Sequence, residues 1–259
     1  MSPGNPVRAR PREPQSHLRL SELALFLDVD GTILEIAPTP DEVVVDEELI
    51  AMLRALSVRT QGALAFVSGR SIAILDVLFH PLVLPTAGLH GFERRNAAGA
   101  YCRRTLPPGE LLARARQSLR ELCERHPELL LEDKRFALAL HYRHVPELER
   151  DVLAEVSHLA VALGPSFAMQ RGRCVVELRP AEARKAAAIS AFMEEPPFHG
   201  RRPVCLGDDL TDECAFDWVN SAGGLSVAVG VSHASVATAH LRSVQSARMW
   251  LRRLLEQPE

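Results

Sequence analysis

Short apolar runs alternate with helical patterns along most of the chain. Residues 46–58 illustrate the helical pattern, because Leu49, Leu53 and Leu56 recur at helical spacing behind an acidic first turn. Apolar runs typical of buried strands occur at residues 23–27, 62–67, 82–84, 204–206 and 225–229, and further helices are predicted at 71–79, 182–193, 213–219 and 247–255. The alternation predicts a doubly wound α/β fold, with helices on both faces of a parallel sheet.

The pattern changes between residues 107 and 180. Helices are predicted there at 110–125 and 146–163, and strands at 129–132, 136–142, 166–170 and 174–178. The order α-β-β-α-β-β indicates a small open α+β unit, which we call the inserted unit. We therefore predict a Rossmann-like core made of residues 21–106 and 181–259, interrupted by this unit. Residues 1–20 are rich in Pro and Arg and are predicted to form a flexible tail.

Composition limits the possible binding partners of the protein and the cellular compartment in which we expect it. A chain of 259 residues with 47% hydrophobic residues can bury a globular core, and a formal net charge of -3 gives no field that would attract nucleic acid. The five cysteines contain no C-x-x-C pair, which is typical of reduced thiols. Without a secretory signal or a long apolar run, we expect a cytoplasmic protein with no membrane partner.

Two acidic residues, Asp28 and Asp30, directly follow the first apolar run. The carboxyl end of a strand is where open α/β sheets place ligand sites. Like charges this close repel, so a cation or a shared proton is needed to hold both, and a divalent metal ion would supply the cation. Gly31 lets the backbone turn closely around an anion, and Thr32 offers a hydroxyl. The alternative is an acidic turn that only closes the strand.

Three further segments place polar groups after apolar runs or at helix starts. The segment Ser68-Gly69-Arg70 follows the second apolar run and opens a helix, so its hydroxyl and backbone N–H groups can face an anion, although an ordinary helix cap has the same sequence. Lys185 lies in the first turns of a predicted helix, where a solvated lysine is the alternative. Asp208 and Asp209 are adjacent acids at a strand end and need a cation nearby, whereas Asp212 also suits the first turn of a helix.

In this order, the segments Asp-Val-Asp-Gly-Thr, Ser-Gly-Arg, a late lysine and Gly-Asp-Asp-Leu-Thr-Asp-Glu resemble the four motifs of the haloacid dehalogenase-like phosphatases. The segments Ala-Gly-Leu-His-Gly, His-Tyr-Arg at 141–143 and Val-Val-Glu-Leu-Arg-Pro at 175–180 resemble the trehalose-6-phosphate phosphatase family in particular. The resemblance covers residues 23–229. One departure is Ala186, which stands where the family usually has Gly after the lysine.

This resemblance implies a magnesium-dependent phosphatase of trehalose biosynthesis that hydrolyses trehalose 6-phosphate. Asp28 would attack phosphorus and form an aspartyl phosphate, and Asp30 would act as general acid and then as general base. Mg²⁺ would be held by Asp28, the backbone carbonyl of Asp30 and Asp208. The remaining motif residues would act around the phosphate: Thr32, Ser68 and Lys185 would bind it, and Asp209 and Asp212 would orient waters or Lys185 from behind.

The family fold would make the inserted unit a cap over the sheet edge, so its polar strand residues are the candidates for sugar recognition. These candidates are Glu132, Lys134, His141, Arg143 and Glu177. Alternating residues on an open sheet can equally face solvent, which is the alternative for each of them.

Other functions remain open at this point. A related phosphatase that acts on sucrose-phosphate or mannosyl-phosphoglycerate would carry the same core motifs, and only the cap would differ. A catalytically silent sugar-phosphate sensor is a second alternative, although its acidic motifs would be expected to decay. We expect the partner to be a small sugar phosphate and the protein to be a monomer.

Overall fold

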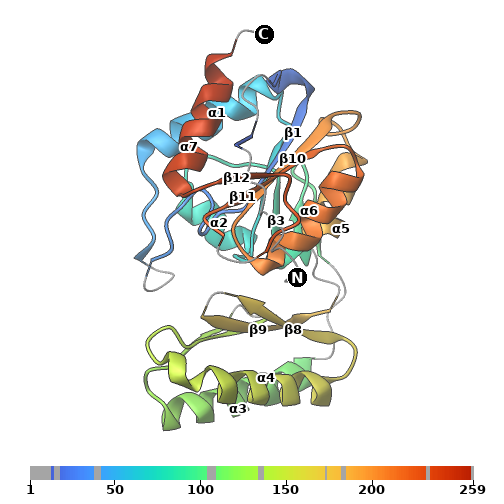
Figure 1. Cartoon of the computed structure of the whole chain (residues 1–259). Helices are drawn as coiled ribbons and strands as arrows, with labels where there is room; N and C mark the ends of the chain where they lie inside the picture. Colours follow the sequence, from blue (N-terminus) through green and yellow to red (C-terminus); the bar gives the residue numbers. More distant parts are fainter. Residues whose placement is uncertain are drawn as a thin grey trace, which may run out of the picture.

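The computed structural model describes residues 13–14, 18–37, 42–103, 109–133, 137–172, 174–181, 185–231 and 234–257. Within these residues, two sheets organise the chain (Figure 1). The predicted α/β architecture with a mostly parallel central sheet is confirmed. None of the helices in the described part of the chain is long and apolar enough to cross a membrane.

The central sheet has the strand order β12-β11-β10-β1-β2-β3-β4-β5. Its strands are β1 (Leu23–Leu27), β2 (Leu64–Val67), β3 (Thr86–Gly88), β4 (Glu93–Arg95), β5 (Tyr101–Arg103), β10 (Arg202–Gly207), β11 (Leu225–Val229) and β12 (Ala239–Leu241). The strands from β12 to β3 are parallel, and β4 and β5 add an antiparallel edge. β1 therefore lies between β10 and β2, with its side chains wholly buried.

Helices cover both faces of the central sheet (Figure 1). They are α1 (Glu47–Arg59), α2 (Ile72–Leu78), α5 (Lys185–Met193), α6 (Glu213–Ser221) and α7 (Val244–Glu256). Leu25 and Leu27 point into the core formed with α1, α2 and α7, whereas Ala24 and Phe26 point into the core formed with α5 and α6. Burial on both faces explains why β1 reads as a continuous apolar run.

The inserted unit contains a second, antiparallel sheet in the order β6-β7-β9-β8. Its elements are α3 (Gly109–Arg125), β6 (Leu130–Asp133), β7 (Leu138–His141), α4 (Glu149–Leu163), β8 (Phe167–Gly172) and β9 (Val175–Pro180), with a short 3-10 helix η4 (Pro146–Leu148). The predicted order α-β-β-α-β-β is confirmed, while the limits 107–180 of a separate domain stay a prediction. Helices α3 and α4 pack on one face of this sheet, and the other face looks toward the central sheet (Figure 1).

The strand predicted from residue 82 is wrong, because β3 begins at Thr86. Pro85 has no N–H to donate to a ladder, and its carbonyl accepts the Phe66 N–H at 3.0 Å just before regular pairing starts. Leu82 and Leu84 are apolar because they fill the core. The strands β4, β5 and β12 were not predicted, since three residues are too few to show a periodic pattern.

Candidate active site

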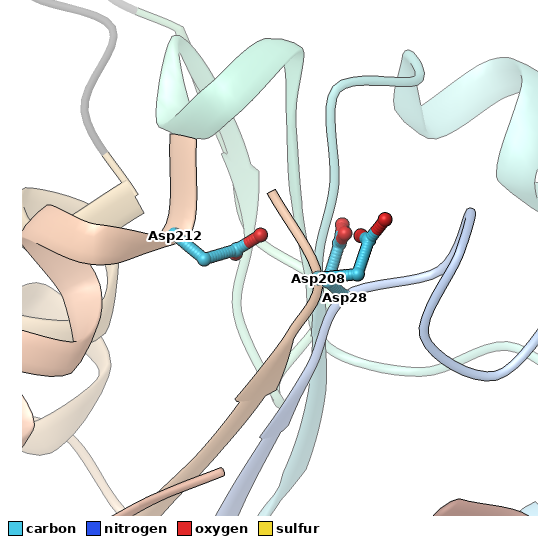
Figure 2. A group of neighbouring side chains, drawn as sticks. All are labelled: Asp28, Asp208 and Asp212. Carbon is cyan, nitrogen blue, oxygen red and sulfur yellow. The ribbon is translucent and has the colours of Figure 1, made fainter. Parts of the chain in front are cut away.

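Three of the acidic and polar motifs meet because their strands are neighbours. Asp28 follows β1, Ser68 follows β2, and Asp208 follows β10. These strands are parallel and adjacent, so their carboxyl ends lie at one edge of the sheet. Figure 2 shows Asp28 and Asp208 side by side at the ends of their strands, with Asp212 approaching from the start of α6. The predicted clustering of these segments thus follows from strand order.

Asp28, Asp208 and Asp212 each offer a carboxylate oxygen, and these oxygens lie within 4.8 Å of one another. Burial raises the pKa of Asp28 to about 6 and that of Asp208 to about 9, and it also raises the pKa of Asp212. Buried carboxylates are costly to ionise unless a cation is near. Carboxylate oxygens are the ligands that Mg²⁺ prefers, so the donor set fits this ion.

Two glycines leave room for these carboxylates. Gly31 has a φ of +78°, and a Cβ there would lie 2.0 Å from Oδ2 of Asp208. A Cβ at Gly207 would lie 2.2 Å from Cγ of Asp212. Distances this short are incompatible with any larger residue unless the carboxylates move. The glycines in both motifs therefore leave the space that the carboxylates of Asp208 and Asp212 occupy.

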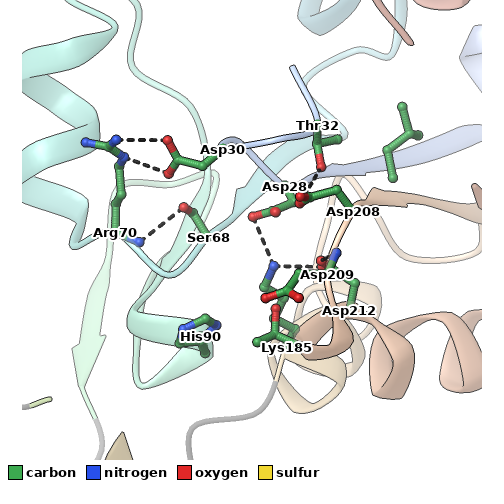
Figure 3. Close-up of polar contacts among 12 residues, drawn as sticks. Asp28, Asp30, Thr32, Ser68, Arg70, His90, Lys185, Asp208, Asp209 and Asp212 are labelled. Atoms are coloured by element: carbon green, nitrogen blue, oxygen red, sulfur yellow. Dashed lines mark hydrogen bonds and ion pairs between the residues drawn. The ribbon is translucent and has the colours of Figure 1, made fainter. Parts of the chain in front are cut away.

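Lys185 is a buried cation between two carboxylates. Its Nζ lies 2.9 Å from Oδ1 of Asp28 and 2.7 Å from Oδ1 of Asp212 (Figure 3). Burial by itself would lower the pKa of Lys185, but Asp212 and Asp28 together raise it above its ordinary value. The side chain is 2% exposed, so the alternative of a solvated lysine is wrong. α5 begins at Lys185 and continues through Ala186, so the departure from the family pattern does not displace the lysine.

Asp209 and Asp212 support this arrangement from a short 3-10 helix, η5 (Leu210–Asp212). The Asp209 side chain accepts from the backbone N–H of Asp212, and the Asp212 carboxylate accepts from the Asp209 N–H at 3.3 Å. This reciprocal capping fixes the carboxylate that contacts Lys185. Asp212 therefore contacts Lys185 directly, and the role of Asp209 and Asp212 in orienting waters or Lys185 stays a prediction.

The Ser-Gly-Arg segment contributes an ion pair as well as a hydroxyl. Arg70 donates to Asp30 through two nitrogens, with Nε 2.7 Å from Oδ2 and Nη2 2.8 Å from Oδ1 (Figure 3). Ser68 is 1% exposed, and its Oγ accepts the Arg70 N–H at 3.1 Å. A bidentate pair fixes the direction of a carboxyl group as well as its position. The side chain of Asp30 thus points toward Arg70.

Thr32 lies deeper than its predicted role suggested. It is fully buried, and its hydroxyl donates to Oδ1 of Asp208 at 3.3 Å. In this arrangement the hydroxyl supports a candidate metal ligand. Its direct contact with phosphate stays a prediction.

The second sheet supplies the opposite wall of the same cavity. Glu132 and Glu177 flank Ala139 in register across β6, β7 and β9. They line the cavity together with His141 on that wall and with Asp28 on the other. The small side chain of Ala139 leaves space between the two glutamates. The alternative in which these positions face solvent on an open sheet does not hold for Glu177, which is 6% exposed.

The two glutamates each contact a histidine. Oε2 of Glu132 lies 3.0 Å from Nε2 of His141, within the same sheet. Oε2 of Glu177 lies 2.7 Å from Nε2 of His90, which belongs to the 3-10 helix η3 (Leu89–Gly91) after β3. The inserted unit and the central sheet therefore share a direct side-chain contact at the cavity.

A family model described as trehalose-phosphatase matches residues 26–247. The trehalose-6-phosphate phosphatase of Escherichia coli (strain K12) is 43% identical over 232 residues, covering 89% of this chain and 86% of that protein. The chain belongs to the trehalose-phosphatase family. The resemblance drawn from its motifs is thereby confirmed.

Solved structures match the fold of this trehalose-phosphatase family member. The C-terminal domain of the C. albicans trehalose-6-phosphate phosphatase matches with a TM-score of 0.85 and 22% identity, over 97% of this chain and 100% of that one. A phosphatase of the haloalkanoate (HAD) enzyme superfamily from Bacteroides thetaiotaomicron matches with a TM-score of 0.59 and 16% identity, over 98% and 99%. At these identities the matches show the shared fold.

Two residues of this trehalose-phosphatase family site were missed from the sequence. Arg70 belongs to the Ser-Gly-Arg motif and His90 to a glycine-rich turn, and neither motif by itself predicts a partner for the side chain. The available signals were an arginine two residues after a strand-end serine and a histidine directly before Gly91. Arg143 lines the cavity but is exposed. Lys134 lies outside the described residues, so its predicted role stays a prediction.

Proposed function

We propose that this trehalose-phosphatase family member hydrolyses trehalose 6-phosphate to trehalose and phosphate through an aspartyl-phosphate intermediate. One observation carries the proposal. A single cavity has Asp28 and Lys185 on the side of the central sheet, and Glu132 and Glu177 on the side of the inserted unit. The first wall suits a phosphoryl group and the second suits hydroxyls, which are the two parts of a sugar phosphate.

In the first step, a carboxylate oxygen of Asp28 attacks phosphorus while the bond from phosphorus to the sugar oxygen breaks. Asp30 gives its proton to that leaving oxygen. In the second step, Asp30 takes a proton from water, and the resulting hydroxide attacks phosphorus and releases the Asp28 carboxylate. Lys185, already held beside Asp28, would offset the charge of the phosphoryl oxygens, and Ser68 would bind one of them.

We assign Mg²⁺ to the carboxylates at the strand ends. Asp28 and Asp208 would hold the ion, with the backbone carbonyl of Asp30 as a further ligand, and Asp212 stands within the same cluster. When bound, the ion supplies Lewis-acid charge that lets an anionic nucleophile approach an anionic ester. The raised pKa values of Asp28 and Asp208 support the assignment, because a cation would remove the cost of ionising them.

Substrate choice is assigned to the inserted unit, acting as a cap. Glu132 and Glu177 can each accept hydrogen bonds from vicinal hydroxyls, and His141 and Arg143 line the same cavity. A site built for hydroxyls rejects a smaller sugar, because its buried polar groups would be left unpaired. Lys134 is assigned to this set from the family resemblance. Five free cysteines support a reducing compartment, and we place the reaction in the cytoplasm.

The test is phosphate release from a panel of sugar phosphates by the purified protein with Mg²⁺. We expect kcat/KM for trehalose 6-phosphate to exceed that for glucose 6-phosphate and sucrose 6-phosphate by about 10²-fold or more. Glu132→Ala and Glu177→Ala should narrow the gap by weakening the trehalose ester selectively. Equal rates on all three esters would contradict the assignment of trehalose 6-phosphate as the preferred substrate, but they would not contradict the phosphatase reaction.

The same panel, extended by mannosyl-phosphoglycerate, separates the two alternatives. A preference for sucrose-phosphate or mannosyl-phosphoglycerate would identify a related sugar phosphatase. Binding without phosphate release from any ester would identify a silent sensor. The intact set of Asp28, Asp30, Lys185 and Asp208 favours catalysis, because each would be free to change in a protein that only binds.

A further inference from the structure

His90 lies where the turn after β3 meets the turn that holds Ser68. Its N–H donates to the Ser68 carbonyl at 2.9 Å, and the Leu89 N–H donates to the Arg70 carbonyl at 3.0 Å. Leu89 and His90 both have left-handed backbone angles, with φ of 51° and 56°. Such angles are costly for residues other than glycine and persist where the surroundings impose them. The position of His90 is therefore tied to the phosphate side of the cavity.

The imidazole ring packs directly on Gly69. A Cβ at Gly69 would lie 2.9 Å from both Cε1 and Nε2 of the ring, so any larger residue would push the ring away. Figure 3 shows His90 beside the turn that carries Ser68. The ring is 10% exposed. Both the backbone and the ring of His90 are thus held by residues of the core.

The same ring reaches across to the inserted unit. Its Nε2 lies 2.7 Å from Oε2 of Glu177 on β9, and the Glu177 side chain is 8% exposed. An ionised carboxylate only accepts hydrogen bonds, so Nε2 donates. Hydrogen bonds of this kind to a charged group are stronger than neutral ones. A residue of the central domain therefore orients a carboxylate of the opposite wall.

Glu132 offers an internal comparison. It lies in the same register row as Glu177, with Ala139 between them, and its histidine partner His141 comes from the same sheet. Movement of the inserted unit would leave the contact of Glu132 with His141 intact, whereas it would break that of Glu177 with His90. The orientation of Glu177 by histidine thus depends on the inserted unit lying against the core.

We infer that His90 is a positioning residue for substrate selection, which fixes the Glu177 carboxylate toward the sugar hydroxyls once the inserted unit lies against the core. Sugar recognition is thereby linked to the turn that holds Ser68. The inference rests on the proposed function, because it takes the sugar of the phosphate ester as the group that Glu177 contacts. His90 acts through Glu177 and takes no part in phosphoryl transfer.

The test compares the wild-type protein with His90→Asn, His90→Gln, Glu177→Ala and the His90→Asn/Glu177→Ala double variant. Asn tolerates the left-handed backbone but is too short to reach Glu177, whereas Gln extends an amide N–H to about the length of Nε2. We would measure kcat and KM with Mg²⁺ on trehalose 6-phosphate and on p-nitrophenyl phosphate, which carries no sugar. His199→Ala, which removes an exposed histidine away from the cavity, is the matched control.

We expect His90→Asn to lower kcat/KM for trehalose 6-phosphate roughly 10- to 100-fold, mainly through KM, as for loss of a hydrogen bond to a charged group. The loss on p-nitrophenyl phosphate should be about tenfold smaller, and His90→Gln should recover part of the activity on the sugar ester. The double variant should be no more than about twofold worse than Glu177→Ala alone, because both changes remove one shared interaction.

Equal losses on the two substrates would place His90 in the phosphate chemistry and overturn the inference. Losses that multiply in the double variant would overturn it too, since they would show that His90 acts independently of Glu177. If circular dichroism shows that His90→Asn does not fold, His90→Gly, which adopts the left-handed backbone without steric cost, replaces it with the same expectations. Failure of the proposed function would be distinct, because wild-type protein would then not prefer trehalose 6-phosphate.

Discussion

Gly31→Ala should lower kcat about 10²-fold while leaving the fold intact, and Gly99→Ala offers a matched control. Both glycines have left-handed backbone angles, with φ of +78° and +81°. A Cβ at Gly99 would meet nothing within 4 Å, whereas a Cβ at Gly31 would lie 2.0 Å from Oδ2 of Asp208. The two variants therefore share the backbone strain and differ in the clash with a candidate metal ligand.

The expected losses of stability and activity follow from the backbone strain and from the clash with Asp208. A left-handed alanine costs about 1–2 kcal/mol, so the free energy of unfolding should fall by about that amount in both variants. In a chain of this size, about 1 kcal/mol lowers Tm by about 2–4 °C. Real Cβ contacts are not shorter than 3.0 Å, so at Gly31 the Asp208 carboxylate must move by about 1 Å. A displacement of that size at a catalytic site can cost about 10²-fold in rate.

The assay measures phosphate release with Mg²⁺, together with thermal unfolding with and without the ion. We expect Gly99→Ala to keep its activity and its stabilisation by Mg²⁺, while Gly31→Ala loses about 10²-fold in kcat and most of the stabilisation. If Gly31→Ala retained activity within about threefold of Gly99→Ala, the placement of Asp208 at the metal would be wrong.

Three further predictions concern the same cluster. Asp28→Asn should keep the fold and lose turnover, since an amide is neither a comparable nucleophile nor a charged ligand; unchanged phosphate release would rule out the mechanism. Arg70→Ala should slow hydrolysis of the sugar ester about 10-fold or more, because Asp30 loses its bidentate partner. Hydrolysis of p-nitrophenyl phosphate should slow less, because the p-nitrophenol leaving group needs little protonation. Equal slowing of both reactions would argue against a role of Arg70 through Asp30. Stabilisation by Mg²⁺, measured as a gain in Tm, should grow from pH 5 to 9. The native pKa values of about 6 for Asp28 and about 9 for Asp208 exceed the ordinary 3.8, so the metal-free native state holds more protons than the unfolded chain and loses stability as pH rises. A gain in Tm that is independent of pH would contradict this prediction.

The core of the site could be predicted from the sequence because each of its parts is local. Asp28 and Asp208 stand directly after apolar runs, and a parallel sheet brings the carboxyl ends of its strands to one edge whatever the loops between them do. Glycines beside them mark where the backbone must turn closely. The burial of Lys185 could not be predicted from the sequence, because a lysine at a helix start is ordinarily solvated; the family resemblance implied only that it binds phosphate.

The contacts that organise the site across long sequence distances became visible only in the tertiary structure. Arg70 meets Asp30 across 40 residues, and His90 meets Glu177 across 87 residues. Neither pair leaves a periodic pattern, because the partners lie on different elements and the contact depends on how those elements pack. The short strands β4, β5 and β12 were not predicted for a related reason. Each forms through backbone hydrogen bonds to a neighbouring strand, and three residues are too few to show a strand pattern in the sequence. Sequence determined the chemistry at the strand ends, and packing of the inserted unit against the core decided which side chains line the opposite wall of the cavity.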